Sequence, residues 1–100
     1  MADTPQYGIT AVRYAGVQVV EAMMGLFDPL RRRWDSRPAP ARVNEVVDRL
    51  VEGDSVVSVF PGDDGMEPGP EVQVDLLPGG TETLVAEGPP GRRLEDLPRF

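Results

Sequence analysis

Clusters of glycine and proline divide the second half of this chain into short segments. The 100 residues include 11 glycines and 11 prolines, more than average usage predicts, and these concentrate at residues 61–70, 78–80 and 88–91. Both residue types interrupt helices and are typical of tight turns. The stretches between the clusters are short and apolar or alternating, so the pattern favours strands joined by turns over long helices.

One stretch before these clusters has helical periodicity. In residues 41–52 the apolar side chains recur at intervals of three and four, which places them on one face of a helix. They are Val43, Val46, Val47 and Leu50. Pro40 suits the first turn of a helix, and Gly53 suits the left-handed conformation that closes one. We predict a helix at about residues 40–53 with the four apolar side chains buried.

Three strands are expected after this helix, at residues 55–60, 71–77 and 81–87. Each is apolar or alternating and is bounded by glycine and proline. The segment between the first two strands, residues 61–70, is expected to be a long acidic loop. Its Asp63, Asp64 and Glu67 offer oxygen ligands, but they lack the spacing of a calcium-binding loop, so we expect no metal there.

The last two strands are predicted to form an antiparallel hairpin. A short turn at residues 78–80, Pro-Gly-Gly, joins them. In the first of them Val72, Val74 and Leu76 alternate with polar residues, which is the pattern of a half-buried strand.

The N-terminal part is less clearly patterned. Residues 7–14 are rich in β-branched and aromatic side chains and are predicted to form a strand. Residues 17–22 favour a second strand that runs back from the turn at residues 15–16. Apolar residues farther along also recur at helical spacing, so residues 23–34 are left open between an extended segment and a helix.

Together these elements predict an α+β fold. We expect a small antiparallel sheet of about five strands, made of an N-terminal hairpin and the three C-terminal strands, packed with one main helix. Residues 1–7 are expected to be a flexible tail and residues 8–100 a single domain. Leu94, Leu97 and Phe100 are too apolar for a free end and are expected to pack onto this domain.

The composition removes most catalytic chemistry. The chain has no histidine, no cysteine and no lysine. The commonest general base, the thiol nucleophile and the Schiff-base amine are therefore all missing. Adjacent carboxylates such as Glu95 and Asp96 lie in a terminal segment with no expected fixed geometry. We predict that the protein is not an enzyme and that it binds no cofactor.

Charge and hydropathy restrict the partners. The formal net charge of −7 disfavours non-specific nucleic-acid binding, which depends on cation density. No apolar run is long enough to span a membrane, so we expect no membrane association. The polar N-terminus lacks the pattern of a secretory signal, and we expect a small soluble protein of the cytoplasm.

Three segments together resemble a known family. They are Ile9-Thr10-Ala11-Val12-Arg13, the unit at residues 42–59 (RVNEVVDRLVEGDSVVSV), and the closing Leu94 with Leu97-Pro98-Arg99-Phe100. Their order and spacing resemble the DUF3892 family of small bacterial and phage proteins, over most of residues 8–100. The family has no characterised activity. The resemblance therefore implies an architecture and a bacterial or phage origin but no chemistry.

The remaining candidate site is a cluster of residue types that are common at binding surfaces. Its members are Met23, Met24, Phe27, Leu30, Arg31, Arg32, Arg33 and Trp34. We predict that this cluster binds a protein partner and that the domain is a non-catalytic interaction or accessory module, such as a subunit of a larger bacterial or phage assembly. The alternative is a nucleic-acid-associated protein in which the arginines grip phosphates and Trp34 stacks on a base. Met23, Met24 and Phe27 fit core positions equally well, and Trp34 can fill the edge of the core while the arginines are solvated or pair with acids.

Overall fold

The computed structural model describes residues 6–63 and 65–100. It contains eight strands, one α-helix and one short 3-10 helix within those residues. In chain order these are β1 (Gln6–Ala15), β2 (Gln18–Asp28), β3 (Arg33–Trp34), β4 (Ala39–Arg42), α1 (Val43–Val51), β5 (Ser55–Gly62), β6 (Gly65–Glu71), β7 (Gln73–Leu76), β8 (Glu82–Val85) and η1 (Leu94–Asp96). The predicted α+β class is confirmed.

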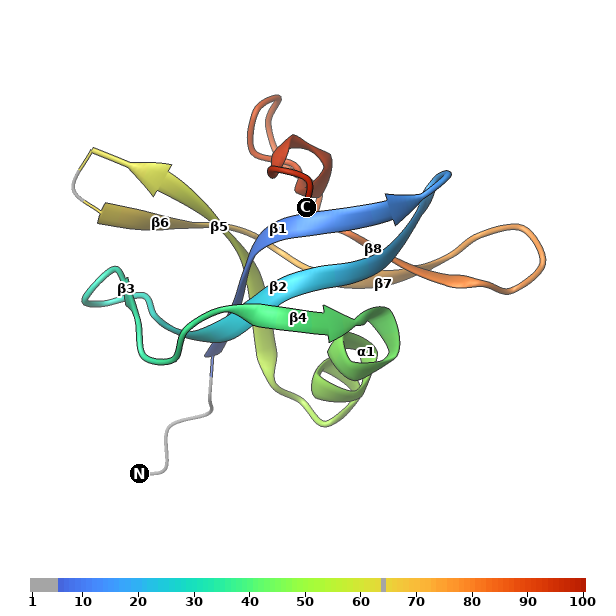
Figure 1. Cartoon of the computed structure of the whole chain (residues 1–100), viewed down its shortest axis with the longest axis horizontal. Coiled ribbons are helices and arrows are strands. Elements are labelled where there is room, and N and C mark those ends of the chain that lie inside the picture. Colours follow the sequence, from blue (N-terminus) through green and yellow to red (C-terminus); the bar gives the residue numbers. More distant parts are fainter. Residues whose placement is uncertain (1–5, 64) are drawn as a thin grey trace.

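The larger sheet has six strands in the order β3-β2-β1-β5-β6, with β4 also pairing to β2. Strands β7 and β8 form a separate two-stranded sheet. In Figure 1 the β5–β6 hairpin and the β7–β8 hairpin extend toward opposite sides of the molecule, and α1 lies beside β4. Among the described residues, no helix has the length and hydrophobicity to cross a membrane.

The large sheet is mixed, where an antiparallel sheet of about five strands was expected. β1 pairs antiparallel with β2 but parallel with β5. Helix α1 explains the difference, because it carries the chain from β4, on the β2 side of the hairpin, to β5 on the β1 side. A connection of this kind returns the next strand in the parallel direction.

The N-terminal hairpin is longer than predicted. The strand expected at residues 17–22 continues to Asp28 as β2, so part of the open segment 23–34 is extended, and β3 follows after a turn. β1 begins at Gln6, where it pairs with Ser55. The end of the expected tail is therefore part of the sheet, and residues 1–5 of that tail lie outside the described residues.

Helix α1 is confirmed but shorter than predicted. Val46 and Val47 are buried, and Val43 and Leu50 pack partly buried against the same core. Pro40 lies in β4 opposite Met23 and not in the first helical turn. A proline is tolerated there because β4 pairs with β2 alone and its missing N–H breaks no ladder.

The acidic segment at residues 61–70 is a hairpin and not a long loop. β5 and β6 pair antiparallel, with Val59 opposite Pro68 and Gly62 opposite Gly65. The prolines of this segment hid the strand from sequence patterning. β6 is the last strand in its sheet, and proline is compatible with such an edge position.

The C-terminal hairpin is confirmed, but its apolar face is only partly covered. The Leu77 N–H donates to the Thr81 carbonyl at 2.8 Å around the predicted turn. Val72 is buried in the core, whereas Val74 and Leu76 are exposed. Beyond Val72 the hairpin extends away from the core, so the apolar face that Val74 and Leu76 share is not covered by the rest of the protein.

The main core joins both hairpins, α1 and the C-terminal segment. Leu94 and Leu97 are buried in it, as predicted. The C-terminal chain also pairs with β1, since the Val12 N–H donates to the Pro98 carbonyl at 3.0 Å and the Phe100 N–H donates to the Val12 carbonyl at 3.3 Å.

The helix allows a test of the core with a matched pair of substitutions. Val46 is 0% exposed and Val51, on the same helix, is 79% exposed. We expect Val46→Asp to lower the free energy of unfolding by at least about 3 kcal/mol, because its carboxylate is buried without a partner.

Val51→Asp places the same carboxylate in water near the helix C-terminus and is expected to cost at most about 1 kcal/mol. Urea or thermal denaturation measures both variants. Equal losses of stability would contradict the assigned helix face.

Candidate interaction surfaces

The structure separates the predicted partner-binding cluster into interior and surface residues. Phe27 is 2% exposed and forms a small core with Val57 and Val59. The Trp34 ring meets the Phe27 ring edge-on, with centroids 5.2 Å apart. Phe27 is therefore a core residue and not an exposed member of the predicted partner-binding cluster, and Trp34 packs against it half-buried.

Gly8 shows how closely Trp34 is packed. A Cβ atom at Gly8 would lie 2.6 Å from Val59 and 3.0 Å from the Trp34 ring. The glycine on β1 therefore leaves the space that the indole occupies.

The two methionines lie on β2 and are half-buried. Met24 packs against the main core. Met23 lies opposite Ala11 of β1 on one side and opposite Pro40 of β4 on the other. Leu30 differs from both, since it is 93% exposed on the turn after β2. Asp28 Oδ1 accepts the Leu30 and Arg31 N–H groups at 3.0 and 3.2 Å, which fixes that turn.

Two of the three clustered arginines are paired with acids. Arg31 lies 3.7 Å from Asp28, and Arg32 Nη2 lies 2.8 Å from Glu67 Oε1. The second oxygen of Glu67 lies 3.0 Å from Arg92 Nη2. Arg33 is exposed, and no ion pair to it occurs within residues 6–63 and 65–100. The positive charge that would meet a phosphate backbone is thus largely engaged by carboxylates.

Arg32 is held firmly in this arrangement. It has a positive φ of 56°, which is uncommon for a residue with a side chain. Its carbonyl accepts the Met66 N–H at 3.3 Å, and its guanidinium reaches Glu67. Arg32 therefore ties the turn before β3 to β6 across the sheet.

No metal-binding cluster of three acidic residues occurs in the part of the chain that the structure describes. Glu67, one of the three acids that offered oxygen ligands in the sequence, forms ion pairs with Arg32 and Arg92. Asp64 lies outside the described residues.

The core role of Phe27 can be tested against Leu30, which lies three residues away. We expect Phe27→Ala to lower the free energy of unfolding by about 3–5 kcal/mol, because it leaves a cavity beneath Trp34.

Leu30→Ala should change the unfolding free energy by less than about 0.5 kcal/mol, because its side chain is already in water. Chemical denaturation followed by Trp34 fluorescence measures both. If the Phe27→Ala variant were as stable as the parent, the assignment of Phe27 to the core would be wrong.

The charge of the chain is concentrated in one segment. Residues 63–91 contain seven acidic residues and no basic residue, and the other positions contain ten of each. The whole net charge of −7 therefore resides in the segment that forms β6, β7 and β8.

The β7–β8 hairpin is the most exposed part of this acidic segment. All four residues of β7 are exposed. Val74 and Leu76 point to the same side of the strand, and Leu76 is 64% exposed. The hairpin thus combines negative charge with apolar side chains that contact no core.

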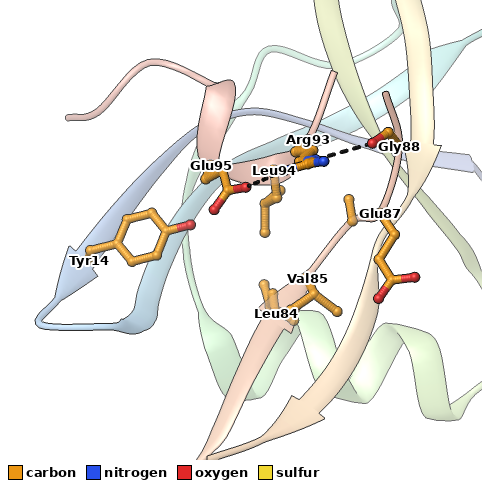
Figure 2. A pocket seen from close by; sticks show the side chains of 9 residues that line it. Tyr14, Leu84, Val85, Glu87, Gly88, Arg93, Leu94 and Glu95 are labelled. Atoms are coloured by element: carbon orange, nitrogen blue, oxygen red, sulfur yellow. Dashed lines mark hydrogen bonds and ion pairs between the residues drawn. The ribbon is translucent and has the colours of Figure 1, made fainter. Parts of the chain in front are cut away.

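A groove of about 480 Å³ lies beside β8 (Figure 2). The end of β8 and the residues that follow it, from Leu84 to Glu87, form one wall, and Tyr14, Leu94 and Glu95 form the other. Arg93 lies at the rim, where it donates to the Gly88 carbonyl at 3.2 Å and lies 3.7 Å from Glu95. The volume is within the range of ligand sites, about 300–1,000 Å³.

Tyr14 is the titratable group that the groove affects most. Burial raises the pKa of its phenol above the ordinary 10.0, the Arg99 guanidinium opposes this rise, and the Glu95 carboxylate adds to it. The Arg99 guanidinium carbon lies 4.4 Å from the centre of the Tyr14 ring, so the two side chains also stack.

We expect the pKa of Tyr14 to lie above 10 and to fall in Glu95→Gln, which removes the neighbouring negative charge. The stability linked to the neutral phenol is present below pH 10 and is lost as the pH rises through the raised pKa.

Ultraviolet titration of phenolate absorbance in a Tyr7→Phe background isolates Tyr14, since the chain has two tyrosines. A higher Tyr14 pKa in the Glu95→Gln variant than in the parent would contradict the assigned geometry.

Sequence patterning did not find this groove. Tyr14 and Glu87 were each assigned to a strand, and Leu94 was expected only to pack. The groove exists because β8 and η1 meet next to the end of β1, and the positions that form it are about 70 residues apart in the chain. No local motif marks such a meeting.

Comparisons with family models, curated proteins and solved structures found no match to this chain. The resemblance to the DUF3892 family therefore stays a prediction.

Proposed function

We propose that this protein is a non-catalytic interaction module that binds a basic protein partner through the β7–β8 hairpin. One observation carries the proposal: an exposed hairpin presents Val74 and Leu76 within a segment that holds the entire net charge of the chain. Exposed apolar side chains surrounded by charge of one sign are typical of surfaces that bind a partner of the opposite sign.

The composition supports a binding role. The chain lacks histidine, cysteine and lysine, and the described carboxylates form no metal-binding cluster. An interaction role requires none of these groups. We place the module in a cytoplasmic bacterial or phage assembly, in keeping with the resemblance to the DUF3892 family.

Burial and ion pairing within residues 23–34 favour the β7–β8 hairpin over this segment as the proposed surface. Phe27 is interior, and Arg31 and Arg32 are paired with acids. These pairs also weaken the nucleic-acid alternative, because guanidiniums bound to carboxylates release few counterions on meeting phosphates. Among the apolar residues of the predicted partner-binding cluster, only Leu30 is almost fully exposed to solvent.

The test uses a partner captured from the native host and then purified. We expect Leu76→Ser to weaken binding by about 1–3 kcal/mol, as for an interface anchor, and affinity to fall with added salt.

Leu30→Ser is the control, since it removes a leucine that is even more exposed, at 93% against 64% for Leu76, from a turn outside the acidic segment. Isothermal titration of the purified pair measures both variants. Equal effects of the two substitutions, or an affinity that does not change with salt, would rule out the hairpin as the binding surface.

A further inference from the structure

The backbone of β8 has a free hydrogen-bonding edge at Leu84. In an antiparallel pair, residues that exchange both backbone hydrogen bonds alternate with residues whose N–H and C=O groups point away from the pair. Leu77 and Thr81 are bonded, and the register continues through Asp75 opposite Thr83. Val74 and Leu84 therefore form a pair of the second kind. The N–H and C=O of Leu84 consequently point to the outer edge of β8.

The neighbouring groups on this edge have partners. The Glu82 carbonyl accepts a hydrogen bond from Gln18 Nε2 at 3.0 Å, and the Ala86 carbonyl accepts one from the Leu94 N–H at 3.3 Å. Between them, no hydrogen bond from another described residue reaches the backbone of Leu84.

The groove lies at this unpaired position. Leu84 is 3% exposed and lines the groove opposite Leu94 and Tyr14 (Figure 2). A buried backbone group without a partner is unfavourable, and an incoming strand would supply the missing hydrogen bonds. The groove thus combines walls of mixed polar and apolar side chains with a backbone donor and acceptor in the geometry of a sheet edge.

We infer that this groove binds an extended peptide segment of a basic partner, which pairs with β8 at Leu84. The inference rests on the proposed function and adds the conformation of the bound segment. A peptide residue opposite Leu84 would exchange both backbone hydrogen bonds with it, as in strand addition to other sheet edges.

Charge at the rim selects a basic peptide. Glu87 lines the groove and is exposed, and no ion pair to it occurs in the described residues. The positive charge of Arg93 is met by Glu95. A lysine or arginine side chain of the peptide would therefore find Glu87 available.

The first experiment measures hydrogen exchange of single amides by NMR in the full chain. In the free protein the Leu84 N–H should exchange about tenfold faster or more than the Val85 N–H, which is paired to Gln73 in the same strand. Equal protection of the two amides would show that the edge is already covered, by this chain or by a second copy, and would overturn the inference.

The second experiment adds a probe, the peptide acetyl-Lys-Val-Lys-Val-Lys-Val-amide. It should slow exchange at Leu84, and the fully N-methylated peptide of the same sequence should bind about tenfold more weakly or worse, because it cannot donate backbone hydrogen bonds. Glu87→Gln should weaken binding of the unmodified peptide, whereas Glu45→Gln, on the exposed side of α1, should leave its affinity unchanged.

The outcomes separate this inference from the proposed function. If both peptides bind equally and Leu84 remains unprotected, strand pairing is wrong while attraction of a basic partner to the acidic hairpin stands. If neither peptide binds at millimolar concentration, strand pairing is also wrong, and the proposed function is decided by the Leu76→Ser and Leu30→Ser comparison with the purified partner.

Discussion

Strand β1 is hydrogen-bonded along both edges, and every other strand of the six-stranded sheet pairs with it directly or through one neighbour. One edge pairs with β2 along nearly its whole length. The other edge pairs with β5 up to Ile9 and with the C-terminal segment at Val12. A register shift between Ile9 and Ala11 lies where the partner changes. Such a bulge increases the twist of a strand, which lets one strand serve two partners that diverge.

The arginines of this protein act mainly as cross-links of the fold. Arg13 lies over the Phe100 ring at 4.7 Å and Arg92 over the Phe60 ring at 5.2 Å, and Arg32 joins Arg92 on Glu67. Each exposed pair contributes little by itself, about 0–1 kcal/mol, but the planar guanidinium suits stacking and paired contacts. Within the acidic segment at residues 63–91, Glu67 receives these two arginines, whereas the other ion pairs of the described residues join arginines to acids outside this segment.

The two sides of the β7–β8 sheet have different surroundings. β8 packs inward, where Thr83 and Leu84 are buried and the Thr83 hydroxyl accepts the Val19 N–H at 2.9 Å. β7 faces solvent along its length. The same hairpin is therefore anchored by one strand and presents the other, together with a groove at the anchored edge. This combination of a rigid base and an open surface is what a binding module requires, because a preorganised surface loses little entropy on association.

The sequence by itself determined the elements whose signals are local. The spacing of Val43, Val46, Val47 and Leu50 specified the helix. The glycines at the turn of residues 78–80, with φ of 92° and 85° at Gly79 and Gly80, specified the hairpin. Only the tertiary structure decided which strands became neighbours. The proline-rich β6 forms because its position at a sheet edge tolerates proline, and Phe27 is interior because Val57, Val59 and Trp34 pack around it. The groove at Leu84 likewise depends on which edge of β8 lacks a partner. Pairing and burial at these positions depend on residues distant in the chain, which local periodicity does not encode.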